Sequence, residues 1–216
     1  MTSNRKTTPS TTTIPLCGPA CLAGPTSGHP FHFRPTELTL RDGTHVTIRS
    51  ITPEDEPRMI AFHQSLSDQS VHSRYFGMLS LGFRTGHERL AALCSTDLSR
   101  EIALVAEHKR KDGEHEILGV GRLIKTPDPD EAEFALLLTD RMQGDGLGTA
   151  LLKSLAAIGR KARLRIIGHV LPDNAAMLHV SRNVGFELKF LPAGGEWQVE
   201  LDLRPEETAR CSHPPV

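Results

Sequence analysis

The chain has 216 residues, of which 38% are hydrophobic and 24% charged, and its formal net charge is −1. This near-neutral balance gives no reason to expect nucleic acid or an anionic membrane as a partner. No apolar run approaches the roughly 18 residues of a membrane-spanning helix, so we expect one globular domain with tails.

The four cysteines are too few and too scattered for a disulfide framework. This usage is typical of a reducing compartment and predicts a cytoplasmic protein. Cys17 and Cys21, together with Cys211 and His213, carry the donor atoms of a zinc site. Both halves of that set lie in segments with little apolar content, so no metal is expected.

The two ends of the chain differ in composition from its middle. Residues 1–36 are rich in Thr, Ser, Pro and Gly and contain no acidic residue before Glu37. Such a segment cannot bury enough apolar surface to offset its ordering entropy, and its few cations and lack of an amphipathic stripe disfavour a transit peptide. We predict a disordered tail over 1–36, one domain over 37–203 and a second tail over 204–216.

Within the domain, hydrophobic periodicity predicts an α/β protein in which strands and helices are interleaved. Thr52 before Pro53 is typical of a helix start, Asp112-Gly113 of a hairpin turn and Gly185 of a helix end. The predicted strands are 44–51, 102–108, 117–124, 132–139, 165–170, 186–190 and 196–203. The predicted helices are 53–65, a broken helical region over 68–95, 146–161 and 174–184.

A glycine-rich turn joins the fourth predicted strand to the long helix, with the sequence Gln143-Gly144-Asp145-Gly146-Leu147-Gly148. A strand, such a turn and a helix start together present free N–H groups and a positive helix end to a phosphate. A P-loop would require Lys-Ser/Thr after Gly148, where this chain has Thr149-Ala150, and the dinucleotide fingerprint also fits poorly. An ordinary turn between a strand and a helix is the alternative.

The spacing Gln143-x-x-Gly146-x-Gly148 resembles the Gln/Arg-x-x-Gly-x-Gly/Ala pyrophosphate loop of the GNAT superfamily of acyl-CoA-dependent N-acyltransferases. Further segments resemble one branch of it, the bacterial protein lysine acetyltransferase (Pat-type) domain. These segments are Leu40–Arg49 with Thr52–Asp55, Ser73–Phe76, Ala132–Ala135, and Asn174–Leu178 with Gly185-Phe186.

The resemblance covers residues 37–203 and implies the fold. It predicts a GNAT fold of the α/β (α+β) class, with a central mixed and mostly antiparallel sheet of six to seven strands flanked by helices. It also predicts that the sheet is splayed between the fourth and fifth strands. In many relatives a tyrosine is the general acid that protonates the leaving CoA thiolate. This chain has Ser181 at that position, so its general acid is unassigned.

Glu133 is the candidate general base, because it matches the glutamate of the Pat-type Ala-Glu-Phe segment. Strand alternation places it on one face with Ala135 and Leu137, unless a bulge, which the family often has here, intervenes. The alternative is an exposed strand residue like Glu131. His169, at the end of the next strand, is a second candidate, as an auxiliary base.

The resemblance further implies that acetyl-CoA is the cosubstrate and that the main chain of Leu136, Leu137 and Leu138 lies along its pantetheine arm. The Leu138 N–H would polarise the thioester carbonyl. Asn174 would contact the cofactor arm, although it could instead cap its helix. The pyrophosphate would be held by the amides of Gln143, Gly144, Asp145, Gly146, Leu147, Gly148 and Thr149.

Three functions are compatible with these residues. The first is an N-acetyltransferase that moves an acetyl group from acetyl-CoA to a protein lysine, by direct attack of the amine on the thioester. The second is a small-molecule amine N-acetyltransferase with the same donor site. The third is a non-catalytic acetyl-CoA-binding sensor. The sequence predicts no nucleic-acid or membrane partner and leaves the oligomeric state open between monomer and homodimer.

Overall fold

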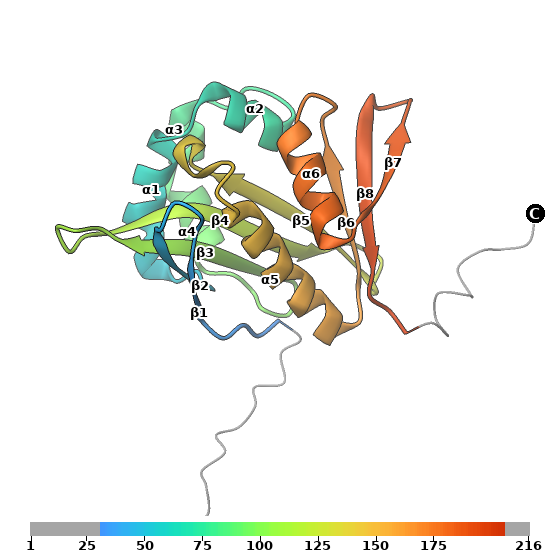
Figure 1. The fold of residues 1–216 in the computed structure, drawn as a ribbon, viewed down its shortest axis with the longest axis horizontal. Helices are drawn as coiled ribbons and strands as arrows, with labels where there is room; N and C mark the ends of the chain where they lie inside the picture. Colours follow the sequence, from blue (N-terminus) through green and yellow to red (C-terminus); the bar gives the residue numbers. More distant parts are fainter. Residues whose placement is uncertain (1–30, 206–216) are drawn as a thin grey trace, which may run out of the picture.

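The computed structural model describes residues 31–205 and contains one sheet in the strand order β1-β2-β3-β4-β5-β6-β8-β7 (Figure 1). Every neighbouring pair is antiparallel except β5 and β6, which are parallel. This confirms the predicted mixed, mostly antiparallel GNAT-type sheet, with one strand more than the seven predicted segments. The strands are β1 Thr36–Thr39, β2 His45–Ser50, β3 Glu101–Lys109, β4 His115–Lys125, β5 Glu131–Leu138, β6 Arg165–Val170, β7 Glu187–Leu191 and β8 Glu196–Asp202.

Helices cover both faces of the sheet (Figure 1). One face packs against α5 and α6, and the other packs against α1, α2 and α4, so that two apolar cores lie on opposite sides of β3, β4 and β5. No helix among residues 31–205 is long and apolar enough to cross a membrane. The helices are α1 Glu56–Gln64, α2 Asp68–Tyr75, α3 Leu81–Arg84, α4 His87–Cys94, α5 Leu147–Ala162 and α6 Ala175–Val184, with 3-10 turns η1 Pro53–Asp55 and η2 Asp140–Met142.

The additional strand, β1, lies at the edge of the sheet and pairs with β2 through a tight turn in which Leu40 N–H bonds to Thr44 O at 2.9 Å. Gly43 adopts a φ of +88° in this turn, a value that favours glycine. None of the four side chains of β1 is buried, so the strand carries little hydrophobic signal. Backbone pairing with β2, and not periodicity, makes this segment a strand.

The ordered domain begins before residue 37. Phe31 is fully buried in the core on the α5 side, and Lys125 lies 5.7 Å from its ring centroid. The segment 31–36 therefore packs as part of the domain. Residues 1–30 and 206–216, and with them Cys17, Cys21, Cys211 and His213, lie outside the described residues.

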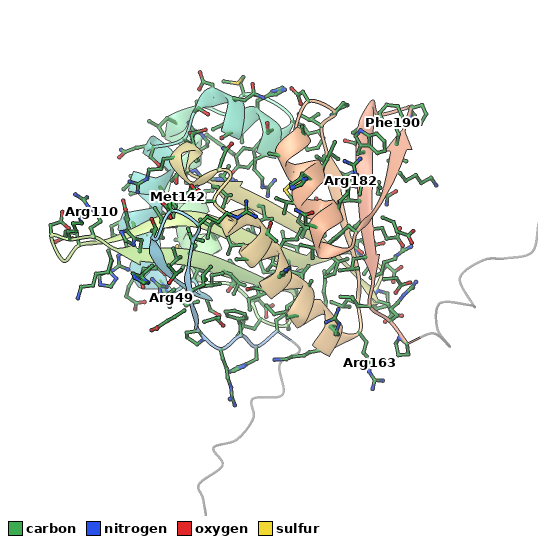
Figure 2. The ribbon with its side chains drawn as sticks, viewed as in Figure 1. Arg49, Arg110, Met142, Arg163, Arg182 and Phe190 are labelled. Carbon is green, nitrogen blue, oxygen red and sulfur yellow. The ribbon has the colours of Figure 1, made fainter. Side chains whose placement is uncertain are left out.

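A network of charged side chains joins β2, β3 and the start of α1. Arg49 makes two hydrogen bonds to Asp55, at 2.7 and 2.8 Å, and two to Glu107, at 2.9 and 3.0 Å. Arg58 contacts Asp55 at 2.8 Å. Figure 2 shows Arg49 at the far end of the sheet from Phe190 of β7. Because Asp55 is fully buried, its charge depends on these partners.

Burial by itself raises the pKa of Asp55, but hydrogen bonds from Arg49, Thr52 and Arg58 outweigh it and hold the pKa below its usual value. A carboxyl whose pKa is lower in the folded state stabilises the fold above its unfolded pKa, near 4. That stabilisation is lost as the pH falls through the folded pKa.

We therefore expect Asp55→Ala to lower the free energy of unfolding by about 1.5–3 kcal/mol at pH 7, because Arg49 and Arg58 lose their charged hydrogen bonds to a buried carboxylate. The difference in the free energy of unfolding between the variant and the unsubstituted protein should decrease below about pH 4. Urea unfolding at pH 7 and pH 3 measures both effects, with Glu54→Ala, an exposed neighbour, as the control that changes little. A gap of constant size across this range would contradict the assignment.

Candidate active site

The sheet opens between β5 and β6. These two strands pair at only three positions, Glu131 with Arg165, Ala132 with Ile166 and Glu133 with Ile167. Beyond them, β5 continues to residue 138 and β6 to residue 170 without pairing to each other. The splay predicted between the fourth and fifth predicted strands is thus confirmed, and its apex lies at Glu133.

An aromatic ring packs on the α5 side of the sheet where pairing stops. Phe134, directly after the last paired residue of β5, packs against Gly168, directly after the last paired residue of β6. A Cβ on Gly168 would lie 2.7 Å from Cζ and 2.9 Å from Cδ1 of this ring, and closer still to Cε1. Phe186 holds the other side of the ring in a T-shaped contact at 5.2 Å. The bare backbone of Gly168 thus accommodates a ring that reaches from β5 over β6 on the α5 side of the sheet.

The main chain of β5 faces this opening. Successive residues of a strand direct their N–H and C=O groups to opposite edges, and Thr139 donates to Leu118 O of β4 at 2.9 Å. Leu136 and Leu138 each lie an odd number of residues before Thr139. Their N–H and C=O groups therefore point toward β6, which does not pair with them. Leu137 instead points its main chain toward β4 and buries its side chain under α1 and α4. Its main chain therefore does not face the opening, and the contact predicted for it with the cofactor arm stays a prediction.

The glycine-rich turn follows the open end of β5 and starts the 16-residue helix α5. Gly144 and Gly146 have φ values of +93° and +92°, and a Cβ at either position would meet no atom within 4 Å. Among residues 31–205, no hydrogen bond is donated by the amides of 144–149. These amides sit at the positive end of the helix, an arrangement that suits an anion.

Gln143 has a different position. Its amide already donates to Asp140 O at 3.2 Å, so the run of free amides begins one residue later than predicted. Its side chain reaches Ser70 Oγ at 3.0 Å, and Asp140 in turn accepts from Ser70 and Ser67 at 2.7 and 2.6 Å. Burial raises the pKa of Asp140, and these serine hydrogen bonds outweigh it and keep the pKa low. This network fixes the turn to α2.

The remaining predicted donor-site residues lie around the same opening. Asn174 accepts a hydrogen bond from the Met177 amide at 3.0 Å, which is the capping role considered for it. Asp145 and Thr149 are half-buried, whereas the side chain of Leu147 is fully buried, so that only its main chain faces the turn. Contacts of these residues with a cofactor stay predictions.

Glu133 lies on the opposite side of the sheet from Phe134 and α5. The β4–β5 register runs without a shift, so no bulge interrupts the predicted alternation. The Glu133 side chain is exposed and makes no hydrogen bond or ion pair with the described part of the chain. A carboxylate at the apex of the splay is therefore accessible from the face that carries α1, α2 and α4.

Cationic side chains border Glu133 on the α2 side. Burial lowers the pKa of Arg74, the charges of Arg122 and Arg89 lower it further, and those of Tyr75 and Glu133 raise it. Arg74 and Arg89 both lie over the Tyr75 ring, at 5.0 and 5.5 Å from its centroid. Arg74 and Arg122 were not identified from the sequence as neighbours of Glu133. The packing of α2 against β5 brings Arg74 there, and the pairing of β4 with β5 brings Arg122.

The cavity beside this cluster is small, with a volume of about 30 Å³, which corresponds to about one water molecule. His63 borders it, and burial, followed by the charges of Arg84 and Arg89, lowers the pKa of His63 to about 4, so its imidazole is neutral at pH 7. The cavity is lined by Met59, Phe62, His63, Arg74, Tyr75, Arg89, Leu93, Val120, Arg122, Ala135 and Leu137.

Comparison with known proteins agrees with this geometry. Residues 45–187, more than half of the chain, match the family model described as an acetyltransferase (GNAT) domain. The chain belongs to the GNAT acetyltransferase family. In this family acetyl-CoA is the acetyl donor, and the splay and the free amides lie where the family resemblance placed the donor.

Individual relatives are similar over most of the domain. A Pseudomonas aeruginosa protein named as an acetyltransferase is 30% identical over 138 residues, which cover 64% of this chain and 71% of that protein. The solved GNAT domain of S. lividans PAT is 29% identical with a TM-score of 0.66, covering 78% of this chain and 97% of that domain. The fold is also shared with Mycobacterium smegmatis RimJ, solved in complex with CoA-disulfide (TM-score 0.60, 18% identity, coverage 83% and 89%).

One further pair of side chains lies beside the apex. His169, the candidate auxiliary base, contacts Glu196 of β8 with its Nδ1 at 2.9 Å. Ser181, at the position where many GNAT relatives carry a tyrosine, is fully buried, and its hydroxyl has no hydrogen-bond partner among the described residues. Glu196 was missed because it lies 27 residues beyond His169 in the chain, and only the β6–β8 pairing brings the two together.

The contact between Phe134 and Gly168 predicts how much stability is lost when residue 168 gains a side chain. Gly168→Ala should lower the free energy of unfolding by about 1–3 kcal/mol, because the ring must move to admit a methyl group. Urea unfolding measures this loss, and Phe134→Leu in the same chain should recover part of it, since the smaller side chain leaves room. If the changes in unfolding free energy of the two single variants simply add in the double variant, the Phe134 ring does not contact residue 168.

Proposed function

We propose that this GNAT protein transfers an acetyl group from acetyl-CoA to a lysine side chain of another protein, by direct attack of the amine on the thioester. The observation that carries the proposal is the arrangement around the splay. The free main-chain edge of β5 leads to the free amides of the glycine turn, and the carboxylate of Glu133 stands at the apex on the other face. The likeness to the S. lividans PAT domain supports the Pat-type branch.

The donor side follows from the unpaired backbone groups. A pantetheine arm can add to the open edge of β5 much as a strand would, because Leu136 and Leu138 direct N–H and C=O groups into the splay. The Leu138 N–H is then placed to polarise the thioester carbonyl. The amides of 144–149 supply donors for the pyrophosphate at the N-terminus of α5.

The acceptor side must provide a neutral amine. A lysine with a pKa near 10.4 requires about 4 kcal/mol to lose its proton at pH 7.4, so a base at the apex is useful. Glu133 is exposed on the face from which the amine arrives and can accept the proton directly or through a water molecule. The C–N bond forms as the C–S bond breaks, and the electron pair leaves with the CoA sulfur.

The shape of this face favours a protein over a small amine as the acceptor. A small-molecule site is commonly a pocket of about 300–1,000 Å³, whereas the cavity lined by Arg74, Arg122 and Ala135 on this face has a volume of about 30 Å³. The nearby segment that contains α2 and α3 instead exposes large apolar side chains, which are typical of surfaces that contact proteins. These side chains are Phe76, Met78, Leu81 and Phe83.

The donor site can be tested by removing one amide. Thr149→Pro deletes an N–H in the first turn of α5, where no intramolecular hydrogen bond is lost, so the fold should persist. We expect acetyl-CoA binding to weaken about tenfold, the value of one hydrogen bond to a charged group. Thr149→Ala keeps the N–H and serves as the matched control. Isothermal titration measures both affinities, and equal affinities would argue against amide contacts.

The base can be tested by Glu133→Gln, which keeps the shape of the side chain but cannot accept the proton. Turnover with acetyl-CoA and lysine-bearing proteins should fall about 10²–10⁴-fold, while acetyl-CoA still raises the melting temperature. Glu131→Gln, two residues earlier on the same face, is the control that should retain turnover. Full activity of Glu133→Gln would exclude this residue as the base, and activity on small amines alone would exclude the protein acceptor.

A further inference from the structure

We propose that His169 is a second proton-transfer group of this acetyltransferase and that Glu196 positions it. This inference rests on the proposed function and adds to it a pair that no comparison assigns. The pair consists of a histidine at the end of β6 and a carboxylate on β8, joined by a contact of 2.9 Å between His169 Nδ1 and Glu196 Oε1.

Position is the first argument. Glu133 and Ile167 are the last paired residues of the two parallel strands, so their side chains lie on the same face of the sheet. His169 follows Ile167 by two residues and therefore points to that face as well. Glu133 thus stands at the apex on β5 and His169 two residues beyond it on β6, both on the face from which the amine reaches the thioester.

The surface around His169 is open. The helices α1, α2 and α4 pack over β3, β4 and β5, and Figure 1 shows them at the end of the sheet away from β7 and β8. The His169 side chain is 33% exposed, and that of Glu196 is 21% exposed. An acceptor amine can therefore approach the imidazole without any helix having to move.

The hydrogen bond with Glu196 decides which nitrogen is available. A carboxylate only accepts hydrogen bonds, so Nδ1 of His169 carries the proton in this contact. In the neutral imidazole the lone pair then resides on Nε2, which makes no hydrogen bond with the described residues. A carboxylate that holds a histidine in one tautomer and stabilises the imidazolium is the same division of roles as in the Ser-His-Asp triad.

The pair also supplies a donor for the acid step. After Glu133 has taken one proton from the lysine ammonium, the neutral amine attacks the thioester, and Nε2 of His169 accepts the second proton from the nitrogen as the C–N bond forms. When the C–S bond breaks, the electron pair goes to sulfur, and the imidazolium returns its proton to the thiolate. Ser181 is a poor alternative, because its hydroxyl is fully buried.

Other charged groups on this part of the sheet contribute to the field that His169 experiences. Glu131 forms an ion pair with Arg165 at 2.6 Å. Among the described residues, Glu196 is the carboxylate that contacts the His169 imidazole. By strand register and by the packing of α2, the charged groups that border this face are Arg122 from β4, Glu131 and Glu133 from β5, Arg165 from β6, Glu187 and Lys189 from β7, Glu196, Glu200 and Asp202 from β8, and Arg74 from α2.

The test compares His169→Gln, Glu196→Gln and Glu196→Ala in the full chain, with acetyl-CoA and poly-L-lysine as substrates and release of the CoA thiol as the readout. We expect His169→Gln to lower kcat about 100-fold with the acetyl-CoA affinity unchanged. Glu196→Ala should approach the same loss, and Glu196→Gln should retain more activity, because an amide oxygen still accepts from Nδ1. His179→Gln, an exposed histidine of α6, is the control.

Two further readouts separate a catalytic role from a structural one. The pH profile of kcat/KM should lose one ionisation in His169→Gln, and the double variant with Glu196→Ala should be no slower than His169→Gln alone, since both substitutions disable one unit. A His169→Gln protein with unchanged kcat and pH profile would overturn this inference and leave the proposed function intact. Acetyl-CoA binding without any turnover by the unsubstituted protein would overturn both.

Discussion

The parallel pairing of β5 with β6 stops after three residues, and the proposed chemistry depends on that interruption. A paired strand has no free main-chain groups, whereas the outer half of β5 directs those of Leu136 and Leu138 into an opening. The ring of Phe134 packs on the bare backbone of Gly168, on the α5 side of the sheet, where the strands separate. The same sheet that stabilises the domain thereby exposes a backbone edge able to bind a linear ligand.

In the proposed reaction the opening also separates the two substrates by face. The glycine turn and α5 lie at the open end of β5, where a diphosphate would be held, and the network of Gln143, Ser70 and Asp140 fixes that turn to α2. Glu133 and His169 lie on the other face, beside the apex. Donor and acceptor can thus approach the same carbon atom from different sides, so that neither must leave before the other binds.

Local features of the site could be predicted from sequence because they depend on local geometry. Gly144 and Gly146 need positive φ, which other residues rarely adopt, and strand alternation determines the face of Glu133 without reference to other segments. Features that depend on partners distant in the chain were missed. Leu137 was grouped with its neighbours although its main chain faces β4, and β1 carries too little hydrophobic signal to be recognised.

The sequence by itself determined the order of strands and helices, the glycine turn and the family to which the domain is similar, because each is encoded in residues adjacent along the chain. Only the tertiary structure decided that Phe31 belongs to the core, that Arg74 borders Glu133 and that Glu196 holds His169. The reason is physical: such contacts are formed by strand register and by helix packing, and neither follows from local propensity.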